Sequence, residues 1–183
     1  MRIILTHEQA DFDALASLLA GRLLDEGALP VLPHRMNRNV RAFVTIYGAE
    51  LPFIEQRDLP GEPVESVCLV DTQSMVTVKG AGNMTRVHVV DHHPRRDDLP
   101  QDWVVTTGET GATTTLLVEM LRENDKNLSV VQATLLLLGI YEDTGSLTYS
   151  RTTARDLKSA AFLLEQGGKL TYRGGFSQPP PLY

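Results

Sequence analysis

Aspartate and histidine side chains that could bind divalent metal ions stand at four separate places in the 183-residue chain. They are His7, Asp11, Asp13, Asp71, the run Asp91-His92-His93, and Asp143. A mixture of carboxylate oxygens and imidazole nitrogens suits Mn²⁺, Mg²⁺, Co²⁺ or Fe²⁺ better than a structural zinc ion. Two such ions would neutralise four carboxylates, so the mixture indicates a two-metal site.

Each place also has a plainer explanation. Asp11 or Asp13 could cap a helix, and Asp71 could serve a turn. The adjacent histidines could be ordinary loop residues, but they point in different directions, so one could bind metal while the other faces substrate. Asp143 and its neighbour Glu142 come at the end of an apolar helix, where a carboxylate meets the negative end of the helix dipole and needs a compensating cation. The four places together are hard to explain as caps and turns.

These side chains stand at the ends of predicted strands and helices. We expect strands over residues 2–6, 28–32, 67–71, 86–91 and 103–106, and helices over about 13–26, 38–47, 112–123, 130–141 and 154–166. Two of the strands are near-continuous apolar runs, which is typical of central parallel strands covered on both faces. The sequence therefore predicts an α/β fold with a mainly parallel sheet flanked by helices, in which ligands gather at the carboxyl ends of the strands.

With these motifs in view, the chain resembles the DHH phosphoesterase superfamily, named for the tripeptide at 91–93. His7-x-x-x-Asp11-x-Asp13 resembles the first motif of that family, Asp71 the second and Asp143 the fourth. The segments 6–17, 111–115 and 138–149 more closely resemble the amino-terminal DHH domain of large bacterial proteins. In those proteins it precedes CBS domains and a poly(A) polymerase-like, tRNA nucleotidyltransferase-related region.

The resemblance implies a role for each motif residue. His7 and Asp11 would bind one metal, Asp13, His92 and Asp143 the other, and Asp71 would bridge the two. His93 would be catalytic and face the phosphate, and Asp91 would orient the neighbouring histidines. The cofactors implied are two divalent cations, with Mn²⁺ first and Mg²⁺ or Co²⁺ as alternatives, which would activate a water for in-line attack.

The resemblance also sets the expected domain organisation. Family members usually carry a carboxy-terminal domain that closes over the substrate, and we expect that domain to be absent here. Residues 1–167 would form the DHH domain and 168–183 a tail or linker. We therefore expect the chain to be a part of a longer multidomain protein, with an oligomeric state that the sequence leaves open.

Three residues are candidates for binding substrate. Asn37 and Arg38 lie in the densest basic stretch and could reach a phosphate chain, although a solvated helix start explains them equally well. Thr113 lies in a threonine-rich segment with hydroxyl and N–H groups suited to phosphate, with a simple helix cap as the alternative. A formal charge of −6 argues against binding of nucleic acid through an overall positive charge, so a polyanion would have to bind to a local group of basic or polar side chains.

The remaining features concern the compartment of the protein. The single cysteine, Cys68, excludes an internal disulfide framework and is read as a core residue. No signal peptide and no apolar run long enough for a membrane helix is present in the sequence, so we expect a cytoplasmic protein without membrane contact.

The sequence thus predicts a metal-dependent phosphoesterase that hydrolyses a phosphodiester or phosphoanhydride bond. Its substrate would be a small polyanion such as a short oligonucleotide, including RNA or DNA ends, a dinucleotide or polyphosphate. The competing interpretation is a non-catalytic regulatory module of a nucleotidyltransferase-type protein, which binds metal and nucleotide without turnover.

Overall fold

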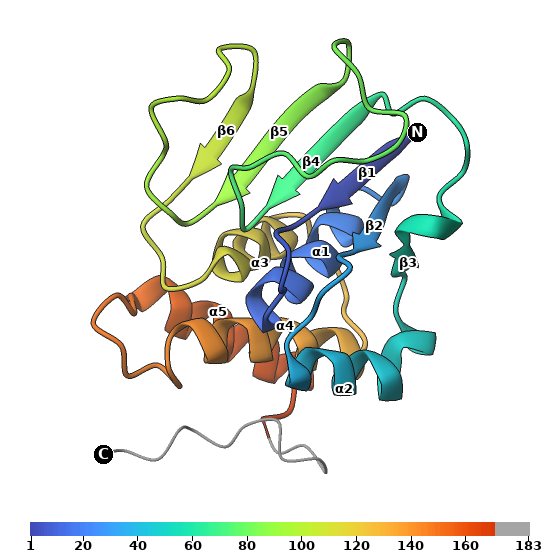
Figure 1. The fold of residues 1–183 in the computed structure, drawn as a ribbon. Helices are drawn as coiled ribbons and strands as arrows, with labels where there is room; N and C mark the ends of the chain where they lie inside the picture. Colours follow the sequence, from blue (N-terminus) through green and yellow to red (C-terminus); the bar gives the residue numbers. More distant parts are fainter. Residues whose placement is uncertain (171–183) are drawn as a thin grey trace.

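Six strands form one sheet in which all neighbouring strands run parallel, in the order β3-β2-β1-β4-β5-β6 (Figure 1). The computed structural model describes residues 1–170. The strands are β1 (Arg2–Leu5), β2 (Ala28–Leu32), β3 (Ile54–Glu55), β4 (Ser66–Val70), β5 (Arg86–Asp91) and β6 (Val104–Thr107). The helices are α1 (Phe12–Leu24), α2 (Arg38–Tyr47), α3 (Thr113–Glu123), α4 (Val130–Asp143) and α5 (Ala154–Glu165), with 3-10 turns η1 (Gly48–Glu50) and η2 (Gln56–Asp58).

This architecture confirms the predicted α/β class and the parallel sheet. Five strands and five helices occur within about two residues of their predicted positions. The sequence analysis missed β3, whose two residues are too few to show a strand pattern, and it missed both 3-10 turns. Of the predicted tail over 168–183, the part from residue 171 onward lies outside the described residues.

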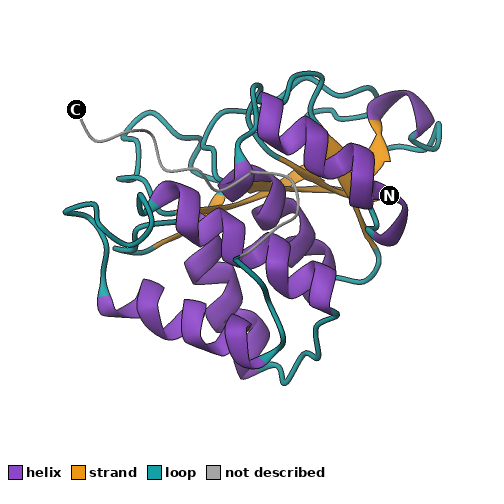
Figure 2. Ribbon diagram, turned by 90° about the horizontal axis from the view of Figure 1, so that it is seen from below, coloured by secondary structure: helices purple, strands orange, loops and turns teal. Residues whose placement is uncertain are grey.

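The five helices lie on one side of the sheet rather than on both (Figures 1 and 2). α1 and α3 contact the strands, and α4 and α5 form a further layer beyond them. The opposite face, which presents Val67, Leu69 and Val89, packs against side chains from connecting segments such as Val64 and Val78. The carboxyl-terminal parts of β4 and β5 are buried on both faces, as their apolar runs predict, but loops provide one of the two covers, and His88 of β5 is exposed.

α4 packs closely against α1 because Gly139 has no side chain at their contact. A Cβ atom at this position would lie 2.7 Å from the Cβ of Ala16 and 2.8 Å from the Oγ1 of Thr114. α4 also begins with a capping box, in which the Ser129 hydroxyl and the Gln132 side chain each accept the other residue's backbone N–H. These features fix the start of α4 and its approach to α1, and therefore place Asp143 at its end.

β1 and β4 are adjacent in the sheet although they are not consecutive in the sequence. From β1 the chain adds β2 and β3 on one side, and from β4 it adds β5 and β6 on the other, so the direction of strand order reverses between them. In parallel α/β sheets such a reversal opens a crevice outside the carboxyl ends of the two strands. His7 follows β1 and Asp71 follows β4, so both residues lie at this crevice. Among residues 1–170, no helix is long and apolar enough to cross a membrane.

Candidate metal centre

The four predicted places come together outside the carboxyl ends of β1, β4 and β5. Potential ligand atoms within 4.8 Å of one another form three groups. The groups are His7, Asp11 and Asp71; Asp13, His92 and Asp143; and Asp71, Asp91, His92 and His93. Asp71 and His92 each occur in two groups, so the three groups form one continuous cluster.

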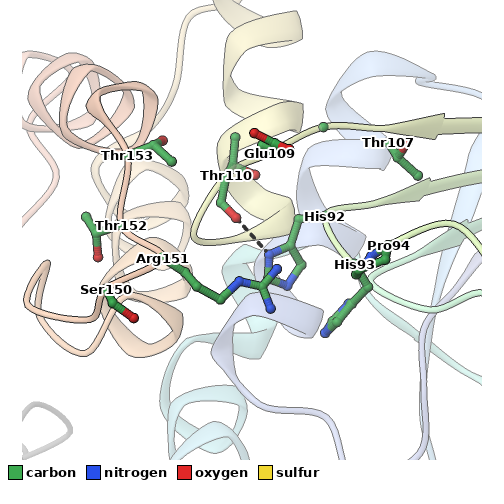
Figure 3. A pocket seen from close by; sticks show the side chains of 11 residues that line it. His92, His93, Pro94, Thr107, Glu109, Thr110, Ser150, Arg151, Thr152 and Thr153 are labelled. Carbon is green, nitrogen blue, oxygen red and sulfur yellow. Dashed lines mark hydrogen bonds between the residues drawn. The ribbon is translucent and has the colours of Figure 1, made fainter.

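His92 offers an unused nitrogen to this cluster. Its Nδ1 lies 3.1 Å from the carbonyl oxygen of Thr110, so this nitrogen donates, and Nε2 carries the free lone pair (Figure 3). Nε2 is buried without a hydrogen-bond partner and lies 3.4 Å from Asp143 Oδ2 and 3.9 Å from Asp71 Oδ1. A buried acceptor beside two carboxylates needs a cation, and a divalent metal ion satisfies all three groups.

Asp71 is held in an uncommon backbone conformation between the two halves of the cluster. Its φ is +56°, in the left-handed region, and its side chain is buried. The hydroxyl of Thr113 donates to Oδ1 at 2.9 Å, and His7 Nε2 lies 3.3 Å from Oδ2. One oxygen of Asp71 thus faces each half of the cluster.

Asp13 is fully buried and joins two helices. Its two carboxylate oxygens accept the backbone N–H groups of Thr113 and Thr114, both at 2.8 Å. The N-cap position of α3, Ala112, has no capping side chain of its own, so Asp13 supplies the cap from α1. The capping explanation and the metal explanation therefore both fit Asp13, since each oxygen keeps a second lone pair for an ion.

The cluster holds more negative charge than it can stabilise alone. Burial, together with the carboxylates of Asp11 and Asp71, raises the pKa of Asp143 to about 7. Burial also raises the pKa of Asp13 well above its usual range. The hydrogen bond with Asp71 raises the pKa of His7 to about 9. Each raised pKa means that the group binds a proton more readily, because the site lacks positive charge. Bound metal cations would supply that positive charge in place of protons.

Asp91 orients His93 and not both histidines. Its Oδ1 lies 2.7 Å from His93 Nδ1 and accepts the backbone N–H of His93, while Oδ2 accepts Gln73 Nε2 at 2.8 Å. His92 takes its orientation from the carbonyl of Thr110. The prediction that Asp91 orients both neighbours is therefore wrong for His92, because the two rings leave the chain in different directions and reach different partners. The His93 side chain is 51% exposed and open to a ligand.

The three predicted substrate-binding residues lie in different surroundings. Thr113 is fully buried and its hydroxyl serves Asp71, so it positions a ligand residue and does not face substrate. Asn37 caps α2 and its amide lies 3.5 Å from Glu142. Arg38 is exposed at the start of α2, where it lines a shallow surface pocket with Met36. The bridge between Ala10 and Met36 brings this segment beside the His7–Asp11 loop.

The Glu142 carboxylate lies at the N-terminus of a helix and does not belong to the groups of potential metal ligands. Its Oε2 accepts the backbone N–H of Phe12, the first residue of α1, at 2.6 Å. The negative end of α4 thus places this carboxylate at the positive end of α1. The expectation that both acids at the end of α4 require a cation is corrected for Glu142, because the N-terminus of α1 offsets a part of its charge, although burial still raises its pKa.

Two residues with a clear role were missed in the sequence. Gln73 is buried, donates to Asp91, and accepts the backbone N–H of Arg96 at 2.8 Å, so it fixes the loop that follows β5. Thr110 positions His92 through a backbone carbonyl, a role that any residue type could fill. The only available signal was the place of Gln73 two residues after Asp71. Cys68 is half-buried and packs against the core rather than lying within it, and burial raises the pKa of its thiol to about 12.

Comparison with known proteins assigns the fold to a family. Residues 2–140 match the DHH family N-terminal domain. The chain is 35% identical over 184 aligned residues to an A-adding tRNA nucleotidyltransferase of Geobacter sulfurreducens, which covers 96% of this chain and 21% of that protein. The chain therefore spans about a fifth of the length of this curated relative.

Hydrolases are also among its relatives. The chain is 38% identical to the bifunctional oligoribonuclease and PAP phosphatase NrnA of Mycoplasma genitalium, over 40% of this chain and 23% of that protein. It is 28% identical to a probable manganese-dependent inorganic pyrophosphatase of Lactobacillus acidophilus, over 91% of this chain and 55% of that protein.

A solved structure shares the fold. A Methanococcus jannaschii protein described as a family II inorganic pyrophosphatase superposes with a TM-score of 0.70 at 22% sequence identity. The superposition covers 90% of this chain and 55% of that one.

Proposed function

The chain belongs to the DHH family, and from this premise we propose that it is a divalent-metal-dependent phosphoesterase acting on a phosphodiester or phosphoanhydride bond of a small polyanion. The observation that carries the proposal is the buried, unpartnered Nε2 of His92 between the carboxylates of Asp71 and Asp143. The names of the relatives support the reaction class, since they include a phosphatase and a pyrophosphatase.

The proposed ligands divide between two ions. His7 and Asp11 would hold one, Asp13, His92 and Asp143 the other, and Asp71 both. The name of the L. acidophilus relative favours Mn²⁺. When bound, such ions supply a water nucleophile at neutral pH and stabilise charge on the reacting phosphate.

The residues of the chain have three further tasks in this proposal. Thr113 and the carbonyl of Thr110 hold Asp71 and His92 in ligand geometry before metal arrives. The exposed ring of His93, which Asp91 and Gln73 orient, faces the phosphate. His93 Nδ1–H donates to Asp91, so Nε2 of His93 is left to exchange a hydrogen bond or a proton with the substrate.

Metal content tests the centre directly. The chain reconstituted with Mn²⁺ is expected to contain about two ions, and Asp71→Ala one or none, by elemental analysis, since Asp71 lies between both groups of ligands. Asp102→Ala, at an exposed aspartate outside the cluster, is the matched control and is expected to keep the wild-type content. A wild-type chain that binds no metal overturns the proposal.

Hydrolysis separates an enzyme from a binding module. The Mn²⁺-loaded chain is expected to hydrolyse bis(p-nitrophenyl) phosphate or pyrophosphate, with loss of activity in EDTA and in Asp71→Ala. Normal metal content without turnover of any phosphoester or phosphoanhydride would instead favour a regulatory module that binds metal and nucleotide. The small share of the curated relative that the chain spans gives that second function its support.

A further inference from the structure

A pocket of about 560 Å³ opens beside the candidate metal centre (Figure 3). His92 and His93 form one wall, residues 107–110 form the second, and residues 150–153 form the third. This volume lies in the range of small-molecule sites and is larger than a single phosphate group fills. The pocket therefore has room for a part of the substrate beyond the group that reacts.

The lining of the pocket favours a phosphate linked to a hydroxyl-bearing group. Among the lining residues that the structure describes, Arg151 is the only arginine or lysine and Glu109 the only carboxylate. Most of the rest of the described lining carries hydroxyl groups, from Thr107, Thr110, Ser150, Thr152 and Thr153. The hydroxyls of Thr110, Thr152 and Thr153 already donate within the chain and keep lone pairs that can accept from a ligand. None of the lining residues within 1–170 is phenylalanine, tyrosine or tryptophan. One cation suits one phosphate, the hydroxyls suit a sugar, and Glu109 disfavours a continuous polyanion.

Arg151 has its charge free for a ligand. It forms no ion pair with residues 1–170, whereas Arg155, in the first turn of α5, is paired with Glu119. Figure 3 shows the Arg151 side chain extended toward His92 and His93. A guanidinium group is planar and binds phosphate through two parallel hydrogen bonds, so it is the side chain best suited to hold a phosphate there.

A fixed turn joins Arg151 to the metal centre. After Asp143 the chain passes through Gly145, Ser146 and Leu147, whose φ angles are +53°, +60° and +66°. The carbonyl of Thr144 accepts the backbone N–H groups of residues 148 and 149 at 3.0 Å, which closes the turn. Three successive left-handed residues persist only where the surrounding structure holds them, so the distance from Asp143 to Arg151 is set by the fold.

We propose that this pocket is a subsite for a second phosphate of the substrate, and that Arg151 binds that phosphate. The proposal rests on the phosphoesterase function proposed above and narrows its substrate. The substrate is then a nucleotide chain in which a sugar separates two phosphates, one at the metal centre and one at Arg151. Pyrophosphate and polyphosphate lack the spacer that the hydroxyl-lined pocket accommodates.

Binding to an uncleavable ligand tests Arg151 without relying on turnover. The probes are two dinucleotides whose bridging ester oxygen is replaced by methylene, with and without a 5′-phosphate, titrated calorimetrically into the Mn²⁺-loaded chain. The 5′-phosphate is expected to tighten binding by roughly 10-fold to 100-fold in the wild type, the range of a charge-assisted hydrogen-bond pair. Arg151→Gln is expected to lose this gain, and Arg151→Lys to keep a part of it.

Arg95→Gln is the matched control, because Arg95 follows His93 closely and is exposed but does not line the pocket. This variant is expected to keep the full gain from the 5′-phosphate. A wild type indifferent to the 5′-phosphate, or an equal loss in Arg95→Gln, would overturn the proposal. So would tripolyphosphate binding that Arg151→Gln weakens as much as dinucleotide binding.

The same preparations separate this proposal from the phosphoesterase function. Arg151→Gln is expected to leave the Mn²⁺ content unchanged, because Arg151 is not one of the proposed metal ligands. Arg95→Gln, outside the pocket, is expected to leave both the Mn²⁺ content and the hydrolysis of bis(p-nitrophenyl) phosphate unchanged. Absence of hydrolysis in the wild type counts against the phosphoesterase function, while a 5′-phosphate gain that depends on Arg151 still supports the subsite.

Discussion

His92 shows how a buried side chain is prepared for a metal ion. Its Nδ1 is committed to a backbone carbonyl, which fixes the tautomer and leaves Nε2 without a partner in a buried position. An unpaired buried acceptor is unfavourable in the folded chain. The unpaired Nε2 therefore makes the metal-free folded chain less stable, and metal binding removes this unfavourable free energy. The raised pKa of Asp143 likewise shows that its carboxylate is poorly stabilised without a cation.

Gln73 is the residue whose replacement separates positioning from metal binding. Gln73→Met keeps the size of the side chain but removes its hydrogen bonds to Asp91 and to the N–H of Arg96. We expect about a 10-fold to 100-fold lower kcat, the range for partners that orient a site, with unchanged Mn²⁺ content. The measurement pairs steady-state kinetics with elemental analysis. Ser74→Ala, at the exposed neighbour, should behave as wild type, and a loss of metal in Gln73→Met would contradict a positioning role.

At the scale of elements, Asp156 joins the beginnings of α3 and α5. Its buried carboxylate accepts the N–H of Gly111, the hydroxyl of Thr115, and both the N–H and the hydroxyl of Thr153. Burial opposes the charge, but these hydrogen bonds outweigh it and hold the pKa of Asp156 below its usual range. The two helices that frame the proposed subsite are thus tied together by one side chain.

Asp156→Asn should destabilise the chain by about 2–4 kcal/mol near neutral pH, because an amide cannot accept all of these donors. The folded pKa lies below the unfolded value, so the stabilisation is complete above about pH 5 and is lost as the pH falls through the folded pKa. Urea unfolding between pH 3 and 7 measures it. The difference between wild type and Asp156→Asn should shrink at low pH, whereas a pH-independent difference would show that charge is irrelevant. Asp102→Asn is the exposed control.

In the turn between α4 and Arg151, a substitution is expected to stabilise the chain, whereas Asp156→Asn destabilises it. Ser146 has a φ of +60°, which costs a residue with a Cβ about 1–2 kcal/mol. Ser146→Gly should raise the unfolding free energy by roughly 0.5–1 kcal/mol, since the greater freedom of unfolded glycine cancels a part of the relief. Ser146→Ala keeps the Cβ and should not stabilise. Thermal unfolding of the two variants decides the matter, and equal melting temperatures would argue against strain.

The sequence predicted these elements better than their connections. Long apolar periodicities gave five strands, five helices and the convergence of the acidic and histidine places, because periodicity and strand ends are local properties. The pairing of Asp13 with α3, of Glu142 with α1 and of Asp156 with Gly111 joins residues more than 40 positions apart. Such contacts depend on the packed structure, and a cap supplied by another element leaves no local pattern.

At the scale of the whole molecule, the metal centre joins segments that are remote in sequence. Its proposed ligands follow β1, begin α1, follow β4, follow β5 and end α4, so nearly every central element contributes. The cluster closes only when the sheet and the helical layers are assembled. Metal binding and folding of the chain should therefore be strongly linked.

Mn²⁺ should stabilise the folded chain through this linkage. Each site at 100 times its dissociation constant adds about 2.7 kcal/mol, because the ion binds the assembled cluster and not the unfolded chain. For a chain of this size the melting temperature should rise by roughly 5–10 °C for one such site. Differential scanning calorimetry across a Mn²⁺ series, with EDTA as the metal-free reference, measures the shift. Asp102→Ala should respond as wild type, while Asp71→Ala should respond little or not at all. An equal shift in Asp71→Ala would mean that Mn²⁺ stabilises the chain by binding at another place. The cluster at the ends of β1, β4 and β5 would then not be the metal centre.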